Sequence, residues 1–107
     1  MPQPIKLFEV LVPTIMRGRP VHLRHHKNWD KFVRSLSGGL TILSPAKGQW
    51  LHPQTKELIS ERVIPVRVAC TDKQLWKILD FTMTHYDQMA VMAYELSSNV
   101  IIKHKEK

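Results

Sequence analysis

The chain of 107 residues has only one cysteine, Cys70. A single thiol forms no internal disulfide, so the sequence gives no support to an oxidising compartment, where small domains are usually disulfide-linked. Residues 1–6 lead directly into a short apolar stretch that ends at Pro13, without the basic region, long apolar region and cleavage site of a secretory signal. We therefore expect a cytoplasmic protein that is neither exported nor membrane-spanning.

The sequence also lacks the motifs that identify common catalytic and cofactor sites. It contains no nucleophile elbow, phosphate-binding loop, dinucleotide fingerprint or paired-carboxylate site. Cys70 stands among apolar residues of a predicted strand, which favours a small buried side chain over a nucleophile. We predict no catalytic residue, no metal site and no cofactor, and an enzymatic function is disfavoured without being excluded.

What is present fits one domain. Hydrophobic residues make up 43% of the chain, and no repeat, low-complexity tract or linker divides it. A chain of this size buries roughly two thirds of its unfolded surface and folds without staples. We therefore assign residues 1–107 to a single domain, with a charged tail at 103–107 that is expected to fray.

Positive charge is the strongest electrostatic feature. The formal net charge is +7 and the pI is about 9.9. Pro13, Gly18 and Pro20 interrupt regular structure, so residues 13–27 are expected to form a basic loop. A basic face either binds nucleic acid or another polyanion, or is simply solvated. The candidate nucleic-acid-binding residues, with only Asp30 as an acidic residue among them, are Arg17, Arg19, Arg24, Lys27, Lys31 and Arg34.

Apolar periodicity predicts the strands. Residues 5–12 are apolar at almost every position, as in an interior strand. Shorter strands are expected at 40–43, 49–51, 89–96 and 100–102. The longest strand is predicted at 58–70, and Pro65 within it should lie at a sheet edge or bulge because proline has no N–H to donate.

Two helices are predicted between these strands. Asn28 can cap the first, whose buried stripe includes Trp29 and Phe32 and which ends at Gly38 or Gly39. Residues 71–74 form a capping box that opens the second. This order of elements predicts an α+β fold of the ferredoxin-like β-α-β-β-α-β kind, with two helices on one face of an antiparallel sheet. The other face, apolar or half apolar, is expected to be covered by a second subunit or a ligand, and a homodimer through the sheet face is the leading prediction.

Histidines near the first helix form an H-x-x-H-H pattern at His22, His25 and His26. Imidazoles one helical turn apart can share zinc. The adjacent Arg24 and the surrounding positive charge oppose a cation, and only Asp30 supplies a carboxylate. A solvated basic segment is therefore the favoured interpretation.

Two further groups combine aromatic and charged side chains. Trp50 offers a ring that either stacks on a base or covers the sheet. Glu61 and Arg62 are neighbours on a strand, so they point to opposite faces and do not pair with each other. Glu61 either lines a pocket or forms an ion pair, with Lys47 or with Arg67 of a neighbouring chain.

These residues also carry a family resemblance. The chain contains W-x-x-F at 29–32, G-L-T-I-L at 39–43, G-Q-W at 48–50 and E-R at 61–62. In this order they resemble a small bacterial family of unknown function whose members are often named lipoproteins, over about residues 5–102. Family members commonly begin with a secretion signal, so their localisation is not carried over. The resemblance implies a ferredoxin-like fold and no established activity; a shared site would comprise Gln49, Trp50, Glu61 and Arg62.

Three functions follow as hypotheses. The first is a homodimeric, non-enzymatic module that binds a small anionic or aromatic ligand between sheet and helices or across the dimer, at Gln49, Trp50, Glu61 and Arg62. The second is a nucleic-acid-binding accessory protein that uses the basic residues. The third, an enzyme, would use Glu61 with His52 or His85 as acid and base.

Overall fold

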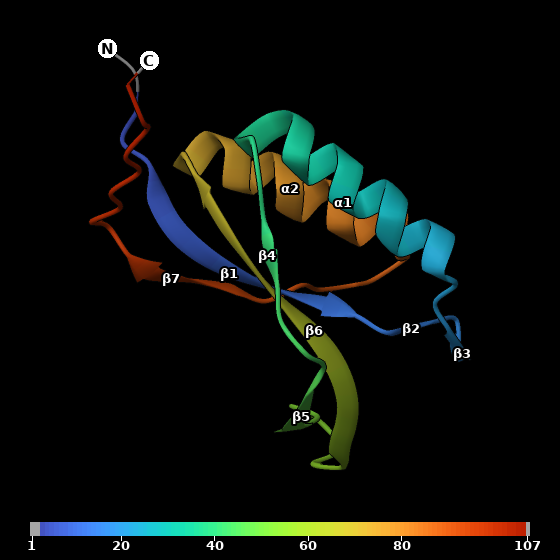
Figure 1. Cartoon of the computed structure of the whole chain (residues 1–107). Helices are drawn as coiled ribbons and strands as arrows, with labels where there is room; N and C mark the ends of the chain where they lie inside the picture. Colours follow the sequence, from blue (N-terminus) through green and yellow to red (C-terminus); the bar gives the residue numbers. More distant parts are fainter. Residues whose placement is uncertain (1–2, 107) are drawn as a thin grey trace.

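Two helices lie on one face of an antiparallel sheet (Figure 1). The computed structural model describes residues 3–106, and it confirms the α+β, ferredoxin-like fold predicted from the sequence. The sheet has the strand order β4-β6-β1-β7, and β5 also pairs with β6. The elements in chain order are β1 (Lys6–Pro13), β2 (Ile15–Met16), β3 (Arg19–Pro20), α1 (Leu23–Ser37), β4 (Thr41–Ile42), β5 (Ala46–Leu51), β6 (Leu58–Cys70), α2 (Asp72–His85) and β7 (Ala93–Ser97).

Strand β1 is central, as its apolar sequence predicts. It pairs with β6 on one side and β7 on the other. Phe8, Val10 and Val12 belong to the buried core beneath the helices. Because side chains alternate along a strand, Glu9 and Leu11 point to the face that the helices leave uncovered.

Strand β6 has the predicted bounds, and Pro65 lies where its neighbour is interrupted. The amide of Leu43 donates to the carbonyl of Pro65 at 2.9 Å, in the stretch between β4 and β5 that has no strand structure. A residue's N–H and C=O point to the same side of an antiparallel strand. The missing N–H of Pro65 therefore faces the interruption, and the expectation of an edge or bulge is confirmed.

Helix α1 begins earlier than predicted. Residue His22, not Asn28, is the N-cap, and its Nδ1 accepts a hydrogen bond from the Arg24 amide at 3.1 Å. The predicted basic loop at 13–27 is therefore wrong as a single loop. Its first half is the short β2–β3 hairpin, and residues from 23 onward are already helical. A histidine ring nitrogen replaces the shorter side chain that usually caps a helix, which is why the start was missed.

The other helix ends follow the sequence. Gly38 closes α1 with φ of 90°, and its amide donates to the Arg34 carbonyl at 2.8 Å. Thr71 and Gln74 form the predicted capping box at the start of α2. Both ends use a residue type whose local chemistry favours that position.

The two helices are joined by packing and hydrogen bonds. The rings of Phe32 and Phe81 stack with centroids 4.0 Å apart. The indole Nε1 of Trp29 donates to the Thr82 hydroxyl at 2.8 Å, and that hydroxyl donates to the Ile78 carbonyl at 2.6 Å. Every polar atom in this buried contact has a partner, so the interface carries no desolvation penalty for an unpaired group.

The C-terminal strands differ from the prediction. The strand expected at 89–96 is β7, at Ala93–Ser97, and residues 100–102 form no strand. A strand needs a hydrogen-bonded neighbour, and no described strand pairs with Val100, Ile101 or Ile102. Residues 98–106 have no helix or strand. The tail expected to fray at 103–107 lies here, apart from residue 107, which is outside the described residues.

A two-stranded arm projects from the body, away from the helices (Figure 1). We use "the arm" for β5, the loop at 52–57 and residues 58–62 of β6. Strand β1 pairs with β6 only from Val63 onward, so residues 58–62 pair with β5 alone. The molecule measures 55 × 28 × 24 Å, which shows how far it departs from a compact sphere.

Candidate functional site

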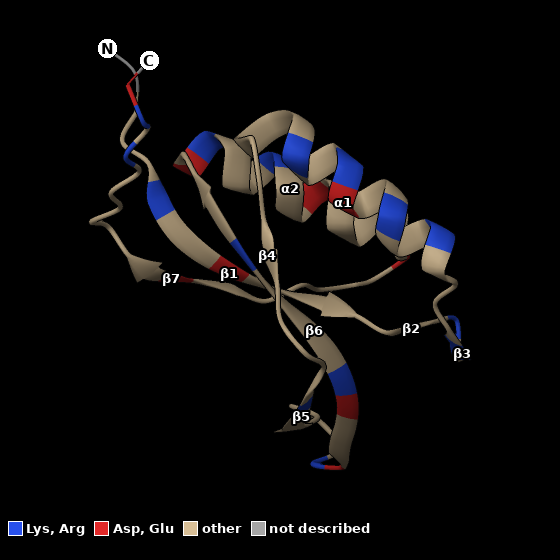
Figure 2. Cartoon of the chain, in the orientation of Figure 1, with Lys and Arg blue, Asp and Glu red and all other residues tan. Residues whose placement is uncertain are grey.

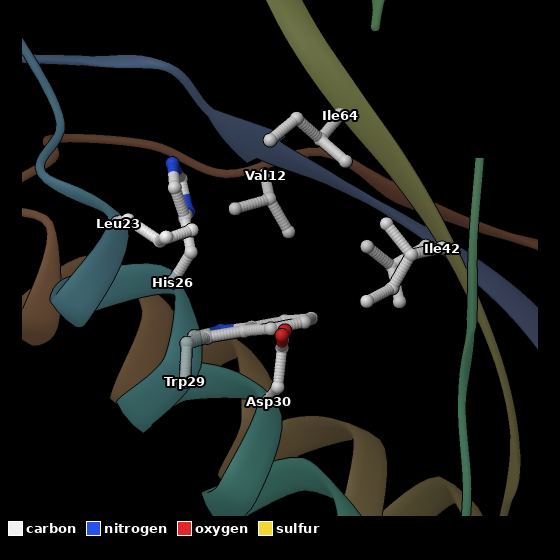
Figure 3. Close-up of a pocket in the computed structure, with 8 residues that line it drawn as sticks. Val12, Leu23, His26, Trp29, Asp30, Ile42 and Ile64 are labelled. Atoms are coloured by element: carbon white, nitrogen blue, oxygen red, sulfur yellow. The ribbon is translucent and has the colours of Figure 1, made fainter. Parts of the chain in front are cut away.

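A pocket opens between α1 and the helix-covered face of the sheet, as Figure 3 shows. Its volume is about 200 Å³. Six of its lining side chains are apolar, and an imidazole and a carboxylate complete the wall. The lining residues come from β1, α1, β4 and β6: Val12, Leu23, His26, Trp29, Asp30, Ile42, Ile64 and Val66.

The inner wall consists of residues that belong to the buried core. Trp29 and Val66 are almost completely buried, and Val12 is 1% exposed. The indole of Trp29 is fixed by its hydrogen bond to Thr82 of α2. The outer wall is more open, since Leu23 and Ile42 are 61% and 54% exposed. The pocket is thus a preformed apolar concavity with an accessible rim.

His26 is held by Tyr86. Its Nδ1 lies 2.8 Å from the Tyr86 hydroxyl, which is itself buried at the end of α2. Burial lowers the pKa of His26 below its usual value, although the Asp30 carboxylate acts in the opposite direction. The imidazole is therefore neutral near pH 7, and Nε2 is the ring nitrogen left for a ligand.

Asp30 is the acidic group of the pocket. Burial raises the pKa of this carboxyl, whereas His26 and Arg34 lower it. The carboxylate is partly buried in an otherwise apolar wall, where a hydrogen-bond donor from a ligand would compensate its lost hydration. The pocket can therefore accept an N–H or O–H at Asp30 while its apolar wall contacts a ring.

The four residues predicted as a ligand site all lie on the arm, outside this pocket. Gln49 and Trp50 stand on β5, and Glu61 and Arg62 stand on the facing part of β6. Trp50 is 43% exposed, and its ring lies over Gly48. A Cβ on Gly48 would lie 3.0 Å from the indole Cζ3, so a larger residue at this position would require the ring to shift.

A polar hollow of about 370 Å³ on the arm is lined by Lys47, Ser60, Glu61 and Arg62. Figure 2 shows the acidic and basic residues adjacent on β6. Within residues 3–106, Glu61 forms no ion pair with Lys47, so that hypothesis is wrong for the single chain. The alternative, Glu61 with Arg67 of a neighbouring chain, stays a prediction.

The structure also reveals a buried polar group that the sequence analysis missed. Glu9 lies on the uncovered sheet face and is 7% exposed. Arg67 Nε donates to Glu9 Oε1 at 3.1 Å, and the Tyr94 hydroxyl donates to Oε2. The hydrogen bond from Tyr94, followed by Arg67, holds the pKa of Glu9 below its usual value. An acidic residue in the middle of an apolar strand was the available signal.

The histidines do not assemble a metal site. His22 caps α1, whereas His25 and His85 pack edge-to-face between the helices with ring centroids 5.5 Å apart. No group of three or more His, Cys, Asp or Glu within residues 3–106 could hold a metal ion.

The acid–base pairs of the enzyme hypothesis are not assembled either. His85 lies on α2 and Glu61 on the arm. His52 follows the last ladder pair of the arm, Leu51 with Leu58, and its Nδ1 accepts from the Gln54 and Thr55 amides.

The predicted basic residues separate into two groups. Arg17 forms an ion pair with Asp87 at 2.7 Å, and Arg19 lies in the β2–β3 hairpin. The remaining four are exposed along α1, where Figure 2 shows basic bands on successive turns: Arg24, Lys27, Lys31 and Arg34.

Solved structures of the same fold are numerous at low sequence identity. A phage SAM lyase in complex with S-methyl-5'-thioadenosine is similar with a TM-score of 0.68 and 6% identity, covering 92% of this chain and 84% of that one. The divalent cation tolerance protein CutA1 from Thermus thermophilus has a TM-score of 0.65 at 11% identity, with coverages of 94% and 87%. CutA1 from a psychrotrophic Shewanella species gives 0.64 at 10%, with coverages of 97% and 88%.

These likenesses show the fold alone. No protein-family model and no curated protein matches the sequence, so the resemblance to the lipoprotein-named family stays a prediction. Among residues 3–106, neither helix combines the length and the hydropathy that crossing a membrane requires.

Proposed function

We propose that the chain is a small-molecule binding module, and that the pocket between α1 and the sheet takes a planar ring compound of the purine nucleoside class. The observation that carries this proposal is the composition of the pocket. Aliphatic and indole surface forms most of the wall, and two hydrogen-bonding groups, His26 and Asp30, stand together on one side. Such a wall suits a flat ring that carries a few N–H groups.

The volume of the pocket limits the size of the ligand that it can enclose. About 200 Å³ is below the roughly 300–1,000 Å³ of sites that enclose a drug-sized molecule. The pocket therefore holds a single ring system, and the rest of a ligand would extend past the open rim. Asp30 is acidic, so an anionic group at that position would be repelled. Of the two ligand classes predicted from the sequence, the aromatic class fits and the anionic class does not.

The phage SAM lyase supports the choice of ring. Its structure contains S-methyl-5'-thioadenosine, a purine joined to an uncharged ribose thioether, on the same fold. The likeness carries no binding residue to this chain, because only 6% of positions are identical. The likeness suggests a probe for the proposed site, an uncharged adenine nucleoside.

We propose in addition that the module self-associates as a homodimer. Tyr94 and Leu96 on the uncovered sheet face are each 41% exposed, and Leu51 and Leu58 on the arm are 60% and 63% exposed. Residues 58–62 and β5 each leave one strand edge unpaired. A second copy that covers this apolar face and pairs with the arm would bury the exposed apolar side chains and would pair the free strand edges.

Isothermal titration with S-methyl-5'-thioadenosine and adenosine tests the pocket. Ile42→Trp should fill the rim and lower the affinity at least about tenfold, because a mismatch of a single methylene in an apolar pocket already costs about that much. Thr41→Trp is the matched control: Thr41 pairs with Arg67, on the uncovered face, and is also exposed. Binding that survives Ile42→Trp unchanged, or no binding of either nucleoside to the wild type, would contradict the proposal.

A further inference from the structure

The exposed charged residues of α1 are all basic, and its one acidic residue, the acidic band on this helix in Figure 2, is the half-buried Asp30 of the pocket. The exposed residues of the helix are Leu23 at the N-terminal end, which lines the pocket, followed by four cations and two neutral polar side chains. From the first to the last cation the helix rises about 15 Å, at 1.5 Å per residue. We define this set as the α1 stripe: Arg24, Lys27, Asn28, Lys31, Arg34 and Ser35.

Arg24, Lys27 and Lys31 are placed where positive charge does little to stabilise the helix, whereas Arg34 lies in the last turn, where positive charge is favourable. The first turn of α1 contains Arg24 and no acidic residue, although the positive end of the helix dipole is there. Lys27 and Lys31 are four residues apart, the spacing at which like charges repel. Only Arg34 has an acidic residue four positions earlier, Asp30.

The stripe is also free of ion pairs. Within residues 3–106, the ion pairs involve Lys6, Arg17 and Arg67, and none involves a cation of the α1 stripe. By contrast, Arg17 of the neighbouring hairpin is neutralised by Asp87. Arg24, Lys27 and Lys31 therefore carry positive charge that no ion pair among the described residues neutralises, and this charge points to a partner outside the fold.

We propose that the α1 stripe docks the phosphate backbone of a nucleic acid. Four exposed cations on one straight element can contact successive phosphates, and Asn28 and Ser35 can donate hydrogen bonds to phosphate oxygens. An anionic membrane is a poorer fit, because amphipathic helices that bind membranes insert apolar side chains, and the stripe has none. This contact is with the backbone and predicts little sequence preference.

The number of cations sets the expected salt dependence. Each phosphate contact contributes about −0.9 to the slope of log K against log salt on duplex DNA, so four contacts give a slope of about −4. Between about 50 mM and about 200 mM salt, the affinity should therefore fall about 150-fold to 250-fold. Removal of two contacts should reduce the slope to about −2 and the fall to about tenfold.

Fluorescence anisotropy with a labelled duplex and a labelled single strand of the same length tests the inference. The variant is Lys27→Gln with Lys31→Gln. The control is Lys103→Gln with Lys105→Gln in the exposed tail, which removes the same charge from a different place. We expect the α1 variant to show the reduced slope and the control to keep the wild-type slope.

Three results would contradict the proposed docking of nucleic acid on the α1 stripe. No binding at about 50 mM salt, equal losses in both variants, or equal binding of polyglutamate or anionic vesicles would overturn the inference. Thermal unfolding serves as the folding check, since removal of the Lys27–Lys31 repulsion should leave stability unchanged or slightly higher. The Ile42→Trp variant should bind nucleic acid normally, so failure of the pocket proposal is distinguishable from failure of this one.

Discussion

Glu9 is the one charged residue that is buried among residues 3–106, and it is buried on the face without helices. Arg67 and Tyr94 both donate to its carboxylate. A buried carboxylate without such donors would be costly, so the three side chains act as a unit. The two outer strands of this unit, β6 and β7, are joined through β1 by side chains as well as by the ladder.

The substitution Tyr94→Phe should lower the free energy of unfolding by about 1 kcal/mol at neutral pH, the net worth of one such hydrogen bond. The pKa of Glu9 is lowered in the folded state, so its stabilisation is complete above the unfolded carboxyl pKa and is lost as the pH falls through the folded pKa. Urea unfolding of both proteins at about pH 7 and about pH 3 measures this. We expect the difference between them to shrink at the lower pH; a difference that grows on acidification would contradict the assignment.

The prediction that Cys70 is a small buried side chain is confirmed. Cys70 is 1% exposed in the core, and burial raises the pKa of its thiol to about 11. The thiol is therefore protonated and unreactive at neutral pH, as its apolar neighbours in the sequence predict. Glu9 was missed because its two donors are 58 and 85 residues away along the chain.

At the scale of elements, the features that depend on residues close together in the chain could be predicted from the sequence. The α2 capping box, the Gly38 terminus of α1 and the β6 bounds depend on residues close together in the chain, and all are confirmed. The start of α1 was wrong because its cap is a histidine. The last strand was wrong because an apolar triplet has no structure without a neighbouring strand.

The end of α1 offers a matched pair of glycines. Gly38 has φ of +90°, whereas Gly39 does not have a positive φ, and a Cβ added at either position would meet open space. Gly38→Ala should therefore lower the free energy of unfolding by about 1 kcal/mol through backbone strain alone. Gly39→Ala should change it by less than about 0.5 kcal/mol. Chemical denaturation measures both, and equal effects would show that the αL conformation does not terminate α1.

At the scale of the whole molecule, the candidate pocket could not be predicted from sequence spacing. Its lining comes from β1, α1, β4 and β6, and the positions run from residue 12 to residue 66. Each lining residue has an ordinary role as a core or edge residue of its own element. The arm residues were grouped correctly because Gln49, Trp50, Glu61 and Arg62 belong to one hairpin, but their ligand-binding role is untested.

Self-association of the whole molecule is tested by a charge placed on the arm. Leu58→Glu places a charge on an exposed apolar position of the arm, and Lys56→Glu is the control in the adjoining loop. A specific dimer interface buries about 1,200–2,000 Å² and excludes unpaired charge. Light scattering should therefore show a dimeric wild type and control, and a variant shifted to monomer. A monomeric wild type at high protein concentration would contradict the homodimer proposal.

The most direct test of the pocket is a two-dimensional amide NMR titration of the labelled protein with S-methyl-5'-thioadenosine. We predict the largest shifts at the Trp29 indole N–H and at the amides of Leu23, Asp30 and Ile42, with little change on the arm. Shifts confined to residues 47–50 and 60–62, or no saturable shift anywhere, would contradict the assignment of the binding site to the pocket between α1 and the sheet.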